Sequence, residues 1–150
     1  MTLYGTIVLI HVIAAVVGLG ASFGMPVVMK GPKTASEARF ALDLNHKIEM
    51  FAKVGSIALL LTGLILGFLN TQLFTTGWYI TSIAIYIAVQ FIVAGIMPKK
   101  IKRMAEIINA HKGEDIPEDY QAINKELRPY NAVLHTSVVV LILLMSIKPF

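Results

Sequence analysis

Four long apolar stretches dominate the pattern of hydrophobic and polar positions along the chain. They cover about residues 3–29, 45–69, 77–97 and 130–147, and none shows the apolar–polar alternation of a barrel strand. Each is close to the roughly 20 residues that a helix needs to cross a bilayer. Since backbone groups in lipid must be hydrogen-bonded within the segment, the pattern predicts an all-α, up-and-down bundle of four transmembrane helices. All 150 residues are expected to form one transmembrane domain.

Composition supports a membrane protein and excludes several classes of site. With 56% hydrophobic and only 15% charged residues, the chain cannot cover a water-soluble surface. It has no Cys, which excludes disulfides, a thiolate nucleophile and Cys-ligated zinc or iron–sulfur sites. The net charge of +4 does not indicate a nucleic-acid partner, because the basic residues flank apolar spans. No nucleotide-binding loop, zinc motif or hydrolase triad is present, so a conventional soluble enzyme is not expected.

The distribution of basic residues predicts the orientation. The turn of residues 70–76 carries no charge, whereas the other two connections carry eleven Lys and Arg: Lys30, Lys33, Arg39, Lys47, Lys99, Lys100, Lys102, Arg103, Lys112, Lys125 and Arg128. The positive-inside rule then places both basic connections in the cytoplasm, and both termini on the non-cytoplasmic side. Phe74, Trp78 and Tyr79 are expected in an outer aromatic belt. The spans and the charge distribution together predict a multi-pass protein of the cell membrane. A bacterial cytoplasmic membrane is the expected location.

The cytoplasmic segment of about residues 98–129 also has helical features. Ile101, Ala105 and Ile108 continue an apolar stripe beyond the third span. Pro117-Glu118-Asp119 is typical of a helix start, with Pro and acidic residues in the first turn. The following pattern of apolar residues suits a short amphipathic helix on the lipid surface, and equally a solvated connector.

Small residues predict where the helices approach one another. Gly20 and Gly24 in the first span, and Gly63 and Gly67 in the second, fit the small-xxx-small pattern of packed membrane helices. These two spans are neighbours in the sequence and are expected to be antiparallel partners. Pro26 is expected to bend the first helix or to end its regular hydrogen bonding.

Polar residues within the spans are the candidates for a site, because lipid makes them costly. They recur at helical spacing and so form stripes. His11 shares a face with Ala15, Gly18, Ser22 and Met25; the other stripes are Ser82, Tyr86 and Gln90, then Asn131 and His135, and Glu49 and Lys53. If these faces turn inward, the interior of the bundle is partly polar, which suits either a binding site or interhelical hydrogen bonds.

His11 lies about 10 Å below the outer surface, at the helical rise of about 1.5 Å per residue. One interpretation is a hydrogen bond to Gln90, Tyr86 or a backbone carbonyl. The other is a ligand to haem iron or a proton-handling group beside a porphyrin. His135 lies at a similar distance from the inner surface, too far from His11 for both to bind one iron unless the helices slide or tilt. His46, near the inner interface, could approach His135, and metal or haem binding by these two is a further alternative.

Several patches resemble the HemJ-type protoporphyrinogen oxidases. His11 is followed fifteen positions later by Pro26, Gly77-Trp78 opens the third span, and the chain ends in an apolar run followed by Lys148-Pro149-Phe150. The layout is equally similar to a sister family of small predicted integral membrane proteins. Two positions depart from the oxidase pattern: Ser82 stands where that family has a lysine, and Gly18 where it has a tryptophan.

The resemblance implies a membrane protein that binds haem or a porphyrin through His11, with Ser82, Tyr86, Gln90 and His135 as further candidate cofactor-binding residues. Only His11 is carried over as a metal ligand, to haem iron. An oxidase acting on a porphyrinogen is the first alternative, and Lys53 or another lysine would then have to replace the missing one. A non-enzymatic scaffold or a small transporter subunit is the second. The expected partners are the lipid bilayer and a haem or porphyrin, and the sequence leaves homo-oligomers open.

Overall fold

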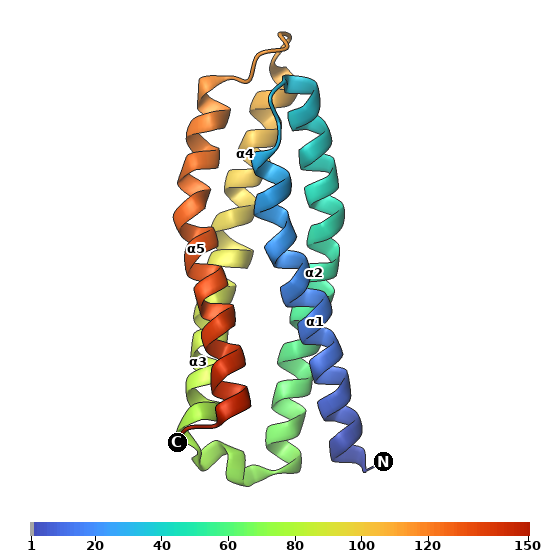
Figure 1. The fold of residues 1–150 in the computed structure, drawn as a ribbon, viewed down its shortest axis with the longest axis vertical. Coiled ribbons are helices and arrows are strands. Elements are labelled where there is room, and N and C mark those ends of the chain that lie inside the picture. Colours follow the sequence, from blue (N-terminus) through green and yellow to red (C-terminus); the bar gives the residue numbers. More distant parts are fainter. Residues whose placement is uncertain (1) are drawn as a thin grey trace.

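The computed structural model describes residues 2–150 and forms an up-and-down bundle of four helical rods (Figure 1). The elements are α1 (Leu3–Lys30), α2 (Ala35–Leu69), the 3-10 turn η1 (Thr71–Thr75), α3 (Gly77–Gln90), the π turn η2 (Phe91–Ile96), α4 (Met97–Ala110) and α5 (Glu118–Ile147). The third rod is α3, η2 and α4 in continuous succession. All four rods are long and apolar enough to cross a membrane, and residues 2–150 contain no strand. The predicted all-α membrane bundle is confirmed.

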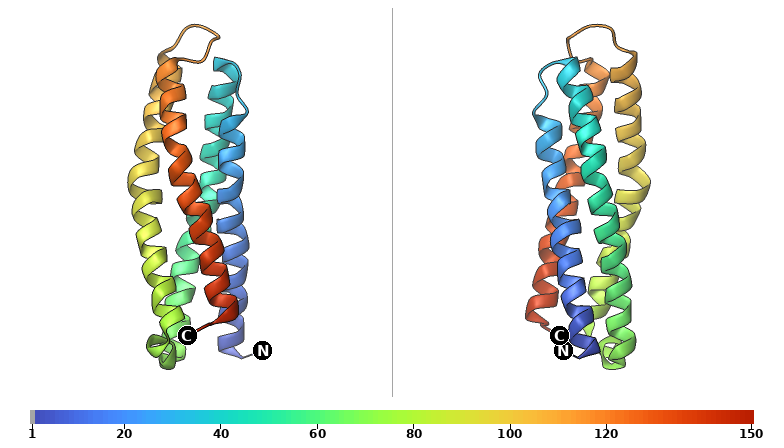
Figure 2. Two further views of the ribbon diagram at one scale, coloured as in Figure 1. Left: turned by 60° about the vertical axis from the view of Figure 1, so that its left-hand side comes forward. Right: turned by 90° about the vertical axis from the view of Figure 1, so that its right-hand side faces the viewer.

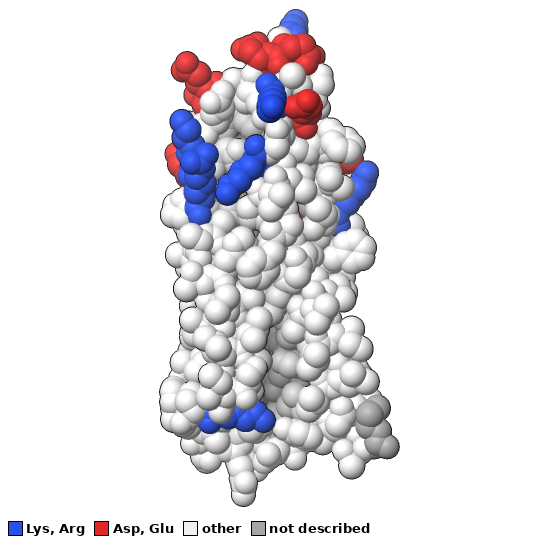
Figure 3. All heavy atoms as spheres, in the orientation of Figure 1, with Lys and Arg blue, Asp and Glu red and all other residues white. Residues whose placement is uncertain are grey.

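Both termini lie at one end of the bundle, beside η1 (Figure 2). We call this the terminal end, and the opposite end, formed by residues 30–53 and 99–128, the polar end. Lys, Arg, Asp and Glu gather at the polar end, and below it the face shown in Figure 3 is uncharged except for one basic patch near the terminal end. A wide uncharged band between the two ends is the surface expected of a protein that sits in lipid.

Local sequence signals explain the helix boundaries. The Thr2 and Thr34 side chains cap α1 and α2 by accepting hydrogen bonds from the backbone N–H groups of Gly5 and Glu37, at 3.1 and 3.2 Å. As predicted, a helix begins at Glu118, directly after Pro117. The π turn precedes Pro98, whose missing N–H interrupts the regular ladder of an α-helix.

The polar end has a closed hydrophobic core. Its fully buried members come from all four rods: Met29, Ala35, Ala38, Leu42, Met104, Ile108, Tyr120 and Leu127. The prediction of a short helix on the lipid surface is therefore wrong, and so is the alternative of a solvated connector. Residues 118–129 are the first turns of α5, and their apolar face packs against α4 within the core that α1 and α2 complete, because that face is more stable against other helices than in water.

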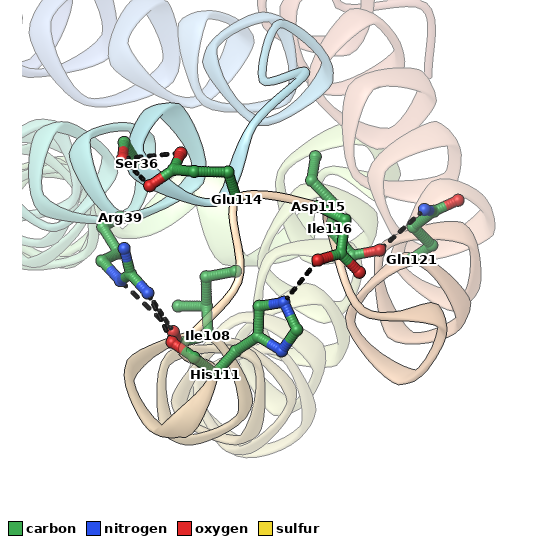
Figure 4. Close-up of polar contacts among 8 residues, drawn as sticks. All are labelled: Ser36, Arg39, Ile108, His111, Glu114, Asp115, Ile116 and Gln121. Carbon is green, nitrogen blue, oxygen red and sulfur yellow. Dashed lines mark hydrogen bonds and ion pairs between the residues drawn. The ribbon is translucent and has the colours of Figure 1, made fainter.

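Polar contacts fasten the loop between α4 and α5 to the start of α2 (Figure 4). The Ser36 hydroxyl donates to both carboxylate oxygens of Glu114, at 2.9 and 3.0 Å, and Ala35 N donates to the Glu114 carbonyl. The Arg39 guanidinium donates to the carbonyls of Ile108 and His111, at 3.1 and 2.7 Å. Arg39 thus satisfies carbonyls that the end of α4 would leave without partners. His111 is hydrogen-bonded to Asp115 at 3.0 Å.

The α1–α2 pair is the closest helix contact, and it forms through Gly18 and Gly55. A Cβ at Gly18 would lie 2.9 Å from the Gly55 backbone, and a Cβ at Gly55 would overlap Gly18. The two helices are antiparallel neighbours, as predicted. The predicted small-xxx-small contact is wrong for Gly20 and Gly24, which have open space around them, whereas Gly63 and Gly67 of α2 do lie against neighbouring helices, at His11 and Tyr79. Gly18 lies on the His11 stripe, so that face does meet the neighbouring helix.

Candidate functional site

A large groove opens between the helices in the half of the bundle nearer the terminal end. It has a volume of about 710 Å³, which lies in the range of small-molecule binding sites. Helices α1, α2, α3 and α5 all contribute to its walls, and the hollow between the rods is visible in Figure 3. The lining is mostly apolar, and its polar members are Tyr4, His11, Trp78, Tyr79, Ser82, Tyr86, Ser146 and Lys148. An apolar groove with a few converging polar groups is the usual form of a ligand site.

His11 lies on the groove wall and is oriented by Thr62 of α2. His11 Nδ1 is 2.7 Å from Thr62 Oγ1, and the Thr62 hydroxyl donates to the Ala58 carbonyl at 2.6 Å. Because the single hydroxyl proton lies between Thr62 and Ala58, we assign the donor of the first bond to His11 Nδ1–H. This tautomer leaves a lone pair on Nε2, which has no hydrogen-bond partner within residues 2–150.

Tyr86 and Gln90 connect α3 to Ser56 of α2 and do not contact His11. The Tyr86 hydroxyl donates to the Ser56 carbonyl at 2.6 Å, and Gln90 Nε2 donates to Ser56 Oγ at 2.9 Å. Of the two, Tyr86 borders the groove. The hydrogen-bond partner of His11 is thus Thr62, and the partners that the sequence indicated for it, Gln90 and Tyr86, are engaged elsewhere.

Tyr79 and Ser82 form the wall contributed by the start of α3. Tyr79 is buried and its hydroxyl donates to the Gly63 carbonyl at 2.9 Å, so its place in an aromatic belt facing lipid was predicted wrongly. Ser82 is 2% exposed, and its hydroxyl donates to the Trp78 carbonyl one turn earlier. Gly63 lies against the edge of the His11 ring, so His11, Gly63 and Tyr79 occupy the same level of the groove.

His135 lies at another level. Its ring stacks on Phe23 with centroids 4.3 Å apart, and its Nε2 is 3.4 Å from the Ser22 carbonyl. That carbonyl lacks its helical partner because Pro26, four residues on, has no N–H. Ser22 follows His11 by eleven residues along α1, which corresponds to about 17 Å at the helical rise. The two histidines therefore cannot bind one iron from opposite sides.

The other candidates lie at the polar end, away from the groove. His46 Nδ1 is 3.7 Å from Glu49, and Lys53 Nζ is 2.8 Å from the same carboxylate. Lys53 precedes Gly63 by ten residues on α2, about 15 Å along the helix, and so does not approach His11. No group of three or more His, Asp or Glu side chains able to hold a metal ion is found within the described part of the chain.

Thr62, Ser56 and the groove-side position of Lys148 were not predicted from the sequence. The first two are polar residues within the second span, where only the charged pair Glu49 and Lys53 was singled out. A survey of hydroxyl residues in every span would have found them, since a hydroxyl in an apolar helix needs a hydrogen-bond partner. Lys148 was read as the end of the last span, and no signal in the sequence places it on Trp78.

Comparison with known proteins identifies the family. No curated protein and no solved structure matches the chain. One family, described as predicted integral membrane protein (DUF2269), matches residues 5–149, which is nearly the whole bundle. The chain therefore belongs to this family of predicted integral membrane proteins.

Proposed function

We propose that this protein binds haem or a porphyrin in the groove, with His11 as the group that contacts the macrocycle. The observation that carries the proposal is the arrangement of His11: a histidine on the wall of a 710 Å³ apolar groove, its Nδ1–H fixed by Thr62 and its Nε2 free. Metal-binding histidines are typically held by a hydrogen bond from the other ring nitrogen. The sequence also resembles the HemJ-type proteins at His11, Pro26 and the chain end, and this resemblance supports haem or a porphyrin as the ligand.

The residues present fit such a ligand. A flat aromatic macrocycle requires a wide apolar site, and the groove walls are built mainly of Val, Leu, Ile and aromatic side chains. A single histidine at this level indicates one protein ligand to iron, because His135 is too far away. Bound haem iron supplies redox or gas-binding chemistry, and a metal-free porphyrin supplies a redox-active or light-absorbing ring.

The neighbouring residues position His11 and shape the groove. Thr62 fixes the tautomer and orientation of the ring, and Gly63 leaves space beside it. Tyr79 and Tyr86 tie α3 to α2 through backbone carbonyls, which keeps the two groove walls in register. Ser82, at the position where the oxidases have a lysine, uses its hydroxyl on its own helix and offers no proton-transfer group at pH 7. We therefore propose binding, and no oxidase reaction.

Absorption spectroscopy of protein purified in mild detergent tests the proposal. The wild type, with or without added haemin, is expected to show a Soret band that His11→Ala abolishes. Thr62→Val keeps the side-chain shape but removes the hydroxyl, and is expected to weaken haem affinity about 10- to 100-fold, the usual effect of losing such a supporting bond. His135→Ala is the matched control and is expected to keep the band.

Two results contradict the proposal. A wild-type protein that stays colourless and takes up no added haemin or porphyrin does so directly. A Soret band that survives in His11→Ala and disappears in His135→Ala does so by moving the ligand to the other level of the bundle.

We also propose the orientation in which the polar end faces the cytoplasm, so that the groove lies in the opposite half of the membrane. Support comes from the charges: Lys and Arg are concentrated in the two connections at the polar end, and η1 at the terminal end has none. Tags on the two termini of the intact chain test the orientation. Labelling by a reagent that cannot cross the membrane is expected at both, and two protected termini would reverse the assignment.

A further inference from the structure

The end of the chain folds back onto the mouth of the groove. Trp78 N donates to the Phe150 carbonyl at 2.9 Å, and the Phe150 ring lies so close to Gly77 that a Cβ there would overlap it. Lys148 ends α5 with φ 50° and ψ 58°, the left-handed conformation, which a lysine rarely adopts. Gly77-Trp78 and Lys148-Pro149-Phe150 are two of the patches that carried the family resemblance in the sequence. In the structure they lie together at the terminal end and form one unit.

This fold-back places a positive charge at the groove. Lys148 Nζ is 5.6 Å from the centre of the Trp78 ring, and both residues line the groove. Every Asp and Glu side chain lies between residues 37 and 126, at the polar end, so Lys148 has no acidic side chain near it. A cation held over an aromatic ring beside an apolar groove is suited to an anionic group on a ligand whose body is apolar.

The spacing matches a ligand that reaches from His11 to the mouth. His11 is level with Gly63, and α2 continues six residues beyond Gly63 to Leu69 at the terminal end, about 9 Å. A macrocycle centred at the level of His11 would therefore have its edge near Lys148. A ligand with its carboxylates on that edge places them in water and beside the cation, where their desolvation cost is lowest.

We infer that Lys148, held on Trp78 by the fold-back of the chain end, binds the carboxylates of the ligand, and that the site selects tetrapyrroles with free carboxylates oriented toward the terminal end. The inference rests on the proposed function and specifies its ligand class. Lys148 acts as a specificity-determining residue at the mouth, separate from His11 in the interior of the groove.

The test compares haemin with its dimethyl ester, in which both carboxylates are blocked. Trp78 is the only tryptophan in the chain, so its emission reports binding at the mouth, while the Soret band reports binding at His11. The charge is removed by Lys148→Asn, because asparagine tolerates the left-handed conformation, and preserved by Lys148→Arg. Lys53→Gln, at the polar end, is the matched loss of one lysine.

The wild type, Lys148→Arg and Lys53→Gln are expected to bind haemin about tenfold more tightly than the diester, which is the scale of one charge-assisted hydrogen bond. Lys148→Asn is expected to bind both alike while keeping the Soret band. Equal affinities in the wild type, or a preference retained in Lys148→Asn, would overturn the inference and leave the proposed function standing.

Failure of the proposed function has a different signature, the absence of a Soret band with either compound. In that case the tetrapyrrole assignment falls with it, and the charge at Lys148 is tested alone. A long-chain carboxylate and the corresponding alcohol are titrated against Trp78 emission. A carboxylate preference that disappears in Lys148→Asn supports the anion site, and equal responses eliminate it.

Discussion

The two halves of the bundle use the same four rods in opposite ways. At the polar end, Ala35, Ala38, Met104 and Ile108 are 0% exposed, and the rods pack closely enough to leave only a small cavity of about 30 Å³. In the other half, the rods separate into pairs around a groove of about 710 Å³. Water drives apolar faces together at the polar end, whereas lipid tails cover apolar side chains as well as a neighbouring helix does. A membrane-embedded half can therefore keep a wide apolar groove that would collapse or aggregate in water.

The contacts in the two halves differ in kind. The polar end is held by packed side chains and by capping contacts such as Arg39 to the α4 carbonyls. The groove half is held by a few contacts between helices: the close approach of Gly18 and Gly55, and the hydrogen bonds from Tyr79 to Gly63 and from Tyr86 to Ser56. The polar end thus holds the four rods together, and the groove half is the part able to accept a ligand.

The largest expected effect is a loss of stability when the core of the polar end is disrupted. Ile108→Ala removes a fully buried side chain from the polar-end core and is expected to lower the free energy of unfolding by about 2–5 kcal/mol. Ile57→Ala removes the same atoms at a side chain that is 62% exposed, and is expected to change stability by about 0.5 kcal/mol or less. Unfolding of the purified protein in mild detergent measures both. Equal losses would mean that the polar end is no better packed than the groove half.

The second effect tests whether the groove half depends on close helix approach. Gly55→Ala adds a Cβ that overlaps the Gly18 backbone, and forcing the helices apart is expected to cost about 1–3 kcal/mol. Gly20→Ala has open space, so it is expected to be neutral or to stabilise α1 by about 0.5–1 kcal/mol. Thermal melts of the two variants are the measurement. If Gly20→Ala were destabilised and Gly55→Ala unaffected, α1 and α2 would meet through the predicted small-xxx-small residues and not through Gly18 and Gly55.

The sequence was sufficient to predict the fold but only part of the site. Span length, helix periodicity and the Pro117 start are local signals, and they led to the four helices and the beginning of α5. The rotation of each helix about its axis is set by packing, which is why Gly20 and Gly24 were predicted to lie in the helix contact and Tyr79 was assigned to lipid. The partners Thr62 for His11 and Trp78 for Lys148 join residues 51 and 70 positions apart, and no local spacing encodes such pairs.

The third effect is the change in stability caused by a buried hydroxyl in the core of the polar end. Tyr120 is 2% exposed, its hydroxyl has no partner among the described residues, and burial raises its pKa to about 12. Tyr120→Phe removes the unpartnered hydroxyl and is expected to stabilise the protein by about 1 kcal/mol at neutral pH. Tyr130→Phe, at a partly exposed tyrosine on the same helix, is the control.

The pH dependence gives Tyr120 a second signature. Its folded pKa lies above the unfolded value of about 10, so ionisation of Tyr120 does not affect wild-type stability below pH 10. As pH rises from about 10 through about 12, the unfolded chain ionises first and the wild type loses stability. The wild type is expected to lose stability over this interval, and Tyr120→Phe to lose less. Parallel curves for the two proteins would show that the hydroxyl is solvated, and that the polar-end core is more open than its packing indicates.

The smallest effect concerns the loop between α4 and α5 at the polar end (Figure 4). The hydrogen bond from His111 holds the pKa of the exposed Asp115 carboxyl below its usual value. A lowered pKa means that the contribution of Asp115 is present above pH of about 4, the unfolded value, and is lost as pH falls through the folded value. Asp115→Asn is therefore expected to be slightly less stable than the wild type at neutral pH and equal to it in strong acid. A titration of the Asp115 carboxyl by NMR checks the direction directly, and a value at or above 4 would show that the loop is held by Ser36, Arg39 and Glu114 alone.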